Sequence, residues 1–280
     1  MTLLGAAQIR ELAAALDLKP SKSLGQNFVI DSNVCTKIVR TAAVGPTDIA
    51  LEIGPGLGSL TLALLEVAQS VVAVEIDPRL AEQLPKTVAN LFGHPENLTV
   101  LNKDALSIQT LPADPTVLVA NLPYNVSVPV LLHLLEKFPT LRTGVVMVQA
   151  EVADRLAAKP GTKDYGIPSV KAAWWADVKG AGSVSRSVFW PAPNVDSKLV
   201  GFTRRPTPGD EELRRKVFTI IDAAFAQRRK MLRSALSGLY GSSSAAQEIL
   251  IRAKIDPTLR GEALEIDGFC AIAAVAPDIF

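Results

Sequence analysis

Five short runs of strand-forming residues alternate with helical stretches, and this alternation restricts the possible folds more than any other feature of the chain. The runs are DIALEI (48–53), SVVAVEI (70–76), LTVLN (98–102), TVLVAN (116–121) and GVVMVQ (144–149). Because they are nearly continuous in apolar residues, we expect them to be buried on both faces, in a parallel sheet covered by helices. Strands that alternate with helices connect through right-handed crossovers. The sequence therefore predicts an α/β protein with a doubly wound sheet.

The pattern changes after the fifth run. Val170–Val178 and Ser197–Arg204 have the spacing of antiparallel strands added at the edge of a sheet. The stretch RRPTPGDEEL (204–213) is rich in proline and charge, as linkers are, and the sequence beyond it is helical to the end. We therefore predict two domains, residues 1–205 and residues 206–280.

A glycine-rich loop follows the first run directly. Gly54, Gly56 and Gly58 would let the chain turn tightly and let a ligand approach the backbone closely. A dinucleotide-binding loop would need a further glycine where Ser59 stands, and the observed G-x-G-x-G form is similar to that of methyltransferases. Glu75 ends the second run, where a carboxylate can accept hydrogen bonds from both hydroxyls of a cofactor ribose. The alternative reading is a tight turn and an exposed glutamate.

The tetrapeptide Asn121-Leu122-Pro123-Tyr124 follows the fourth run. It suits one chemical problem, because the exocyclic amino nitrogen of adenine is a poor nucleophile whose lone pair is delocalised into the ring. The side-chain carbonyl of Asn121 and a rigid backbone carbonyl can each accept one N–H and so orient the amine. Pro123 fixes the turn, and Tyr124 offers a face for stacking the base. We predict all four as catalytic residues; the alternative is a strand-end turn with a core tyrosine.

Two further segments carry candidate residues. Asp104 follows the third run and could accept the amino group of a cofactor adenine, or equally cap a helix. The loop Ser187–Ser197 presents two aromatic residues between prolines. We predict that Phe189 stacks on the second face of a flipped base and that Trp190 packs between domains. Packing between domains is the alternative for Phe189 as well.

The formal net charge of the chain is only +1, so any surface for nucleic acid must be local. We predict one continuous helix over Glu211–Leu236, with seven basic and three acidic residues and thus a local charge of +4. On a helical wheel Arg228 falls within the apolar face and should be an inter-domain structural residue and not an RNA contact. The outward-facing Arg229, Lys230 and Arg233 are predicted to bind RNA phosphates, with a merely solvated face as the alternative.

Taken together, these motifs resemble the KsgA/RsmA family of small-subunit (16S) ribosomal RNA adenine N6-dimethyltransferases. The resemblance covers nearly the whole chain, from LGQNF (24–28) through EIGPGLG and NLPY to VFWPAPNVDS and AFAQRRKMLRSAL. It implies a Rossmann-like class I methyltransferase domain over 1–205 and a small all-helical RNA-binding domain over 206–280. The cofactor that it implies is S-adenosyl-L-methionine. By position in the family's motifs, the cofactor-binding residues would be Asn27, Val29, Gly54, Glu75, Asp104 and Asn121.

The same resemblance implies a reaction and a substrate. The family transfers four methyl groups to two adjacent adenines in a hairpin near the 3′ end of 16S rRNA, during biogenesis of the small ribosomal subunit. One motif departs from the family's pattern: Ile167-Pro168 stands where the family usually has Arg-Leu, which removes one possible RNA contact.

Other functions remain open. An enzyme of the erythromycin-resistance type would methylate 23S rRNA with the same tetrapeptide, and relatives used as mitochondrial transcription factors bind nucleic acid without needing catalysis. A DNA adenine methyltransferase often has an acidic residue where Asn121 stands. An NAD-dependent oxidoreductase is disfavoured by Ser59 and by the lack of a proton-relay constellation.

Composition excludes several other classes. Cys35 and Cys270 are far apart and are not spaced as zinc ligands, so we expect neither a disulfide framework nor a metal site. No run of about eighteen apolar residues occurs, and the first residues form no clean signal core. We expect a soluble, cytoplasmic monomer that does not bind membranes.

Overall fold

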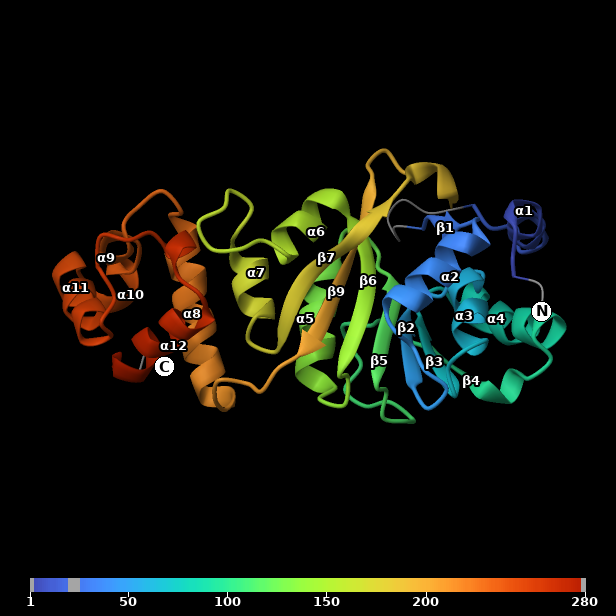
Figure 1. Ribbon diagram of the computed structural model, residues 1–280, viewed down its shortest axis with the longest axis horizontal. Helices are drawn as coiled ribbons and strands as arrows, with labels where there is room; N and C mark the ends of the chain where they lie inside the picture. Colours follow the sequence, from blue (N-terminus) through green and yellow to red (C-terminus); the bar gives the residue numbers. More distant parts are fainter. Residues whose placement is uncertain (1–2, 20–25, 278–280) are drawn as a thin grey trace. The chain divides into compact units, whose positions relative to one another are not determined.

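The computed structural model describes residues 3–19 and 26–277 (Figure 1). The chain divides into two compact units, each built from two segments: Met1–Ala153 with Lys179–Arg204, and Asp154–Val178 with Arg205–Phe280. The boundary between the units falls between Val178 and Lys179, within strand β7 (Ala176–Val184). The predicted domain division after residue 205 stays a prediction.

The five apolar runs form the five parallel strands of the first unit, as predicted. They are β2 (Ile49–Ile53), β3 (Ser70–Glu75), β4 (Leu98–Asn102), β5 (Val117–Asn121) and β6 (Thr143–Gln149). Among the described residues they belong to a seven-stranded sheet of order β4-β3-β2-β5-β6-β9-β7. Strand β2 pairs in parallel with both β3 and β5, so the chain reverses its direction of winding there. In such sheets the ligand-binding crevice lies outside the carboxyl ends of the strands at that point. The α/β doubly wound fold is confirmed.

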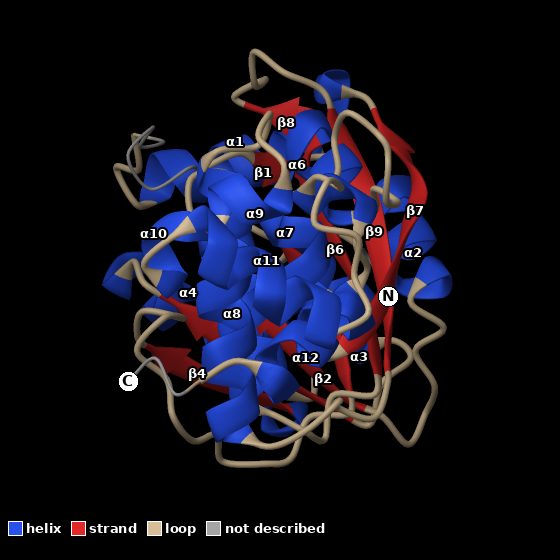
Figure 2. Cartoon of the chain, turned by 90° about the vertical axis from the view of Figure 1, so that its left-hand side faces the viewer, coloured by secondary structure: helices blue, strands red, loops and turns tan. Residues whose placement is uncertain are grey.

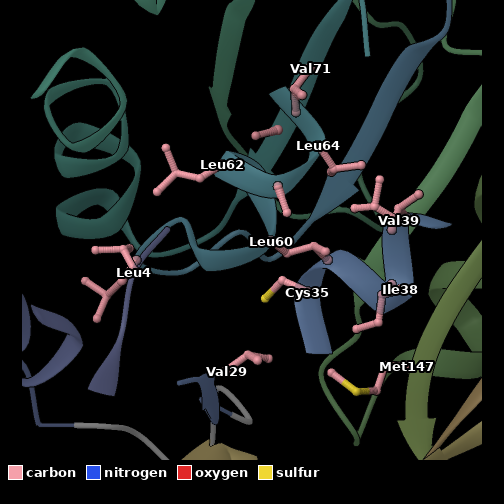
Figure 3. Close-up of a cluster of buried hydrophobic side chains, with 14 of the residues drawn as sticks. Leu4, Val29, Cys35, Ile38, Val39, Leu60, Leu62, Leu64, Val71 and Met147 are labelled. Atoms are coloured by element: carbon pink, nitrogen blue, oxygen red, sulfur yellow. The ribbon is translucent and has the colours of Figure 1, made fainter. Parts of the chain in front are cut away.

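The helices of the first unit lie between and beside these strands in the chain. They are α1 (Ala6–Ala15), α2 (Ser32–Thr41), α3 (Ser59–Leu65), α4 (Pro78–Leu91), the 3₁₀ turn η1 (Pro95–Asn97) and α5 (Ser127–Lys137), with α6 (Ala150–Leu156) across the junction of the two units. Every residue of α3 is buried. Figure 3 shows why: Leu60, Leu62 and Leu64 of α3 share one cluster with side chains of α2, such as Ile38. This packing fixes the helix whose first turn follows the glycine loop.

Of the two strands predicted at the edge of the sheet, one is confirmed and the other was predicted with the wrong bounds. Strand β9 (Ser197–Arg204) pairs antiparallel with β6, from Gln149↔Ser197 to Thr143↔Thr203, as expected of an added edge strand. Val170–Val178 is not one strand: helix α7 (Ile167–Ala172) takes its first residues, and β7 begins only at Ala176. Pro168 accounts for the difference, because proline suits the first turn of a helix.

A second, two-stranded sheet joins segments far apart in the sequence. Strands β1 (Phe28–Val29) and β8 (Phe189–Trp190) pair antiparallel, with Phe28 opposite Trp190 and Val29 opposite Phe189. The 3₁₀ turn η2 (Arg186–Val188) precedes β8. This pairing ties the described end of the LGQNF motif to the proline-rich loop; Leu24 and Gly25 of that motif lie outside the described residues.

The second unit is helical apart from the start of β7 (Figure 2). Besides α7 it holds α8 (Glu211–Ala226), α9 (Leu232–Ala235), α10 (Ser237–Tyr240), α11 (Ser243–Arg252), η3 (Gly261–Ala263) and α12 (Ile266–Val275). The prediction of one helix over Glu211–Leu236 is wrong, because α8 ends at Ala226. Beyond the break, backbone N–H groups bond to a distant loop of the same unit: Leu232 donates to Leu259 O at 2.7 Å, and Arg233 donates to Pro257 O at 3.3 Å.

In the parts of the chain that the structure describes, no helix has the length and apolar character needed to span a membrane.

Candidate active site

A cavity of about 230 Å³ lies at the carboxyl ends of β2, β3 and β5 in the first unit. This is the place where the reversal of winding predicts a ligand crevice. Most of its wall is apolar and a few polar groups converge on it, as in small-molecule sites generally. All of the predicted cofactor-binding residues line this cavity: Asn27, Val29, Gly54, Glu75, Asp104 and Asn121. The fold therefore gathers into one wall residues that the sequence separates widely, while their roles stay predictions.

The glycine loop requires glycine for two independent reasons. Gly54 and Gly56 have φ of 68° and 58°, in the left-handed region that side chains disfavour. A Cβ atom on Gly56 would also lie 2.9 Å from Cδ1 of Phe28, closer than such atoms approach one another. The Phe28 ring thus covers this turn, and the backbone of both glycines lines the cavity. Without side chains at these two positions, a ligand in the cavity can approach the backbone closely.

Glu75 is buried, with 4% of its surface exposed, so the alternative of an exposed glutamate is wrong. Its carboxylate accepts hydrogen bonds from the Asp77 N–H at 2.9 Å and from the Gly56 N–H at 3.1 Å. Burial raises the pKa of Glu75, against the effect of these N–H groups. An ionised carboxylate has about four acceptor sites, more than these two bonds occupy. Glu75 therefore holds the glycine loop and keeps acceptor capacity for a ligand, while its role toward a ribose stays a prediction.

The tetrapeptide after β5 is anchored at three points. Leu122 is buried and donates its N–H to Met147 O at 3.0 Å, and Val126 donates its N–H to Pro123 O at 3.2 Å. Asn121 Nδ2 donates to the main-chain oxygen of Asn27 at 3.1 Å. Because the amide nitrogen is used in this way, the Oδ1 atom of Asn121 is the end left to accept a hydrogen bond. Asn121 itself lines the cavity, and its role toward an amine stays a prediction.

Tyr124 is half-buried, beside Pro123 and Asn125 of the cavity wall. Its hydroxyl lies 2.7 Å from Oγ of Ser197, with which it shares a hydrogen bond. Burial raises the pKa of Tyr124, so the phenol is neutral in the physiological range. The ring is thus held at its far end, a contact that sequence reasoning did not predict.

The two aromatic residues of the loop before β9 have different environments. Phe189 is 3% exposed and packs in a hydrophobic cluster whose members all belong to the first unit, so it is a packing residue of that unit and not of a domain boundary. Its stacking on a base stays a prediction and would require the loop to open. Trp190 is half-buried and stacks on Phe28, with ring centroids 6.3 Å apart and ring planes 26° apart.

Asp104 lies on the turn after β4 and is exposed. Its Oδ1 atom accepts the N–H of Leu106 at 2.9 Å, so it stabilises a turn; no helix begins there, and the alternative of a helix cap is wrong. It also lines the cavity, and the two roles are compatible because a carboxylate has acceptor sites to spare.

Many residues of the wall were not predicted, and three of them have properties that bear on the site. Ile76 and Leu106 are exposed apolar side chains at the cavity, and exposure is a property that the sequence does not show. Glu52 is buried and accepts a hydrogen bond from the Thr61 hydroxyl at 2.6 Å. Burial, reinforced by the charge of Glu75, raises the pKa of Glu52 to about 8 despite that hydrogen bond. An acidic residue inside an apolar strand was the signal that could have identified it.

The predicted RNA-binding residues lie in the second unit, and not on one helix face. Arg229 and Lys230 are exposed in the turn after α8. Arg233, on α9, is half-buried and donates from NH1 to Gln247 Oε1 at 3.1 Å. Arg228 binds Glu262 and also donates to Thr162 O at 3.2 Å, which agrees with a structural role. The break in the helix therefore places two of the three predicted contacts on a solvent-facing turn.

Comparison with known protein families gives one match over almost the whole chain. The family described as "Ribosomal RNA adenine dimethylase" matches residues 18–277. The chain is 57% identical over 272 residues to the ribosomal RNA small subunit methyltransferase A of Paenarthrobacter aurescens, which covers 97% of this chain and 93% of that protein. It is 58% identical over 280 residues to the protein of the same name from Streptomyces griseus, covering 99% and 96%.

Solved structures agree on the fold. A dimethyladenosine transferase from Plasmodium falciparum is similar with a TM-score of 0.73 and 24% identity, over 88% of this chain and 95% of that one. The 23S rRNA methyltransferase ErmE is similar with a TM-score of 0.66 and 27% identity, over 89% and 99%.

Proposed function

We propose, on the premise that this chain belongs to the ribosomal RNA adenine dimethylase family, that it dimethylates the N6 amino groups of two adjacent adenines near the 3′ end of 16S rRNA. The chain is an enzyme, a ribosomal RNA methyltransferase. The choice of the small subunit is supported by relatives at 57% and 58% identity that are named for it. The single observation that supports this chemistry is the hydrogen bond from Asn121 Nδ2 to Asn27 O, which orients the Asn121 amide at the end of β5 beside the cavity.

S-adenosylmethionine is the methyl donor that we propose for this cavity, and when bound it supplies an electrophilic methyl group on a sulfonium. Glu75 would accept its ribose hydroxyls, and Asp104 the amino group of its adenine. The residues Asn27 and Val29 and the backbone of Gly54 would complete the wall. The buried carboxylate and the bare glycine backbone support this assignment, since both suit an adenosyl group.

The protein's own part in the reaction is to orient the amine. Asn121 Oδ1 would accept one N–H of the target adenine, and a main-chain carbonyl of the turn the other. Both acceptors hold the nitrogen toward the methyl group and favour its pyramidal form, so positioning and electrostatics lower the barrier without a strong base. Tyr124 would stack on the flipped base. The anchored turn supports this role, because its three hydrogen bonds hold the acceptors in place.

Methylation of isolated ribosomal particles tests the proposed function. The protein is incubated with labelled S-adenosylmethionine and with small-subunit particles that lack the modification, and the methylated bases are mapped. We expect dimethylation of two adjacent adenines near the 3′ end of 16S rRNA. Large-subunit particles are the control. Labelling of 23S rRNA in place of 16S rRNA would show instead an enzyme of the type represented by ErmE.

Replacing Arg229, Lys230 and Arg233 together by alanine should weaken binding to the small-subunit particle. It should also flatten the dependence of log K on log salt concentration, by nearly one unit of slope for each lost phosphate contact. The control triple variant replaces the exposed Arg252, Lys254 and Arg260 of the same unit by alanine.

The control variant removes the same charge from other positions, so it should change affinity and slope less. Equal effects of the two triple variants, measured by filter binding over a salt series, would show that the turn after α8 has no special role.

A further inference from the structure

We propose that Ser197 is a positioning residue for methyl transfer, which acts by holding the Tyr124 ring at its hydroxyl end. The inference rests on the proposed function, in which Tyr124 stacks on the target base. It assigns a role to a residue that lies 73 positions away from Tyr124 in the sequence.

Ser197 offers a rigid point of attachment. It is the first residue of β9 and lies opposite Gln149 in the antiparallel pairing with β6. Next to it, the Ala150 N–H donates to Asp196 O at 2.9 Å, which continues the pairing beyond the strand. The side chain of Ser197 has no exposed surface, with a residue exposure of 0%. Its hydroxyl is therefore fixed by the sheet itself.

Tyr124, in contrast, lies outside regular secondary structure. It follows Pro123 in the turn between β5 and α5, and the backbone bonds of that turn leave its side chain two rotatable bonds. The hydrogen bond of 2.7 Å between Oη of Tyr124 and Oγ of Ser197 removes this freedom at the end of the ring farthest from the backbone. Ser197 is fully buried and Tyr124 is half-buried, and in such surroundings a hydrogen bond is stronger than in water and its loss leaves a partner unpaired.

The hydrogen bond to Ser197 uses only the hydroxyl of Tyr124 and leaves the faces of its ring for stacking. The hydroxyl edge of the ring is committed to the sheet, while the residue as a whole is only half-buried and its neighbours Pro123 and Asn125 line the cavity. An aromatic side chain stacks more effectively when its rotamer is fixed before the base binds, because no side-chain entropy is then lost on binding. Loss of the bond should therefore lower the rate at which a bound adenine reacts, and leave the affinity for the particle unchanged.

A double-mutant cycle tests this inference. The variants Ser197→Ala, Tyr124→Phe and their combination each remove only oxygen atoms, so the ring and the strand remain. Single-turnover methylation is measured at saturating S-adenosylmethionine and small-subunit particles. We expect each single variant to react about three- to tenfold more slowly, the size of one neutral hydrogen bond. The double variant should be no slower than the slower single variant, because both act on the same bond.

Two matched controls remove buried hydroxyls elsewhere. Tyr165 donates its hydroxyl to Leu264 O at 2.8 Å, and Ser169 donates to Arg155 O, both within the second unit. Tyr165→Phe and Ser169→Ala should lower thermal stability like the test variants but keep the wild-type rate. A common loss of rate in all four single variants would overturn the inference, since it would reflect stability alone.

The remaining outcomes are equally definite. A wild-type rate for Ser197→Ala, or losses that multiply in the double variant, would overturn the positioning role while the proposed function stands. A wild-type protein that methylates neither 16S adenine would overturn the proposed function, and the inference with it.

Discussion

Replacement of Asn121 by alanine should slow methylation at saturating cofactor and RNA by about a hundredfold to a thousandfold, or about 2.7–4 kcal/mol, as for other positioned hydrogen-bonding groups in active sites. The variant loses the acceptor for one N–H of the adenine amine. It also loses the bond from Nδ2 to Asn27 O, which holds the segment that carries Phe28 against the glycine loop. Single-turnover kinetics measure the chemical step directly.

Affinity for the particle is the control for Asn121→Ala. It should barely change, because phosphate contacts dominate the binding of a large RNA surface. A wild-type rate in this variant would mean that the tetrapeptide is only a turn and that another group orients the amine.

Glu75→Ala should weaken the binding of S-adenosylmethionine by about 1.5–3 kcal/mol, the usual range for hydrogen bonds to a charged group. Two effects contribute. The ribose hydroxyls lose their acceptor, and the N–H groups of Gly56 and Asp77 lose the carboxylate that holds the glycine loop in shape. Isothermal titration calorimetry of the purified protein measures the loss.

NAD is the control ligand for this measurement. The wild-type protein should bind S-adenosylmethionine and not NAD, because the loop lacks the third glycine of a dinucleotide site at Ser59. Binding of both ligands with equal strength would contradict the cofactor assignment.

The sheet and the cavity could be predicted because both follow from local patterns. Apolar runs of strand length show where the parallel strands are, and the carboxyl ends of neighbouring parallel strands must meet at one edge. Polar residues placed directly after such runs, such as Glu75 and Asn121, therefore converge whatever the details of the loops. Glu52 was not predicted, although its position inside an apolar run already implied that it would be buried.

The details that could not be predicted depend on contacts between distant residues. The sequence after Glu211 has a continuous helical pattern, yet α8 ends at Ala226, and beyond it Leu232 and Arg233 donate their backbone N–H groups to Leu259 and Pro257 of a later loop. Phe189 resembles an exposed loop aromatic in sequence, but its pairing opposite Val29 draws it into the core. The bond between Tyr124 and Ser197 likewise exists only once β9 has been placed beside β6.

Trp174 and Trp175 are synthesised well before the helix on which they pack. Both indoles are buried in the finished protein, edge-on against Phe218 of α8 at centroid distances of 6.2 and 5.5 Å. As the chain leaves the ribosome, strands β7 and β9 emerge between these tryptophans and Phe218, so two large apolar rings stay uncovered while the sheet is completed. A recombinant fragment that ends at residue 205 would lack Phe218, leave both indole rings exposed on that side and tend to aggregate. A fragment that omits residues 154–178 along with the C-terminal helices would lack this surface, because the two segments belong to the same compact unit, but it would also lack the first three residues of β7.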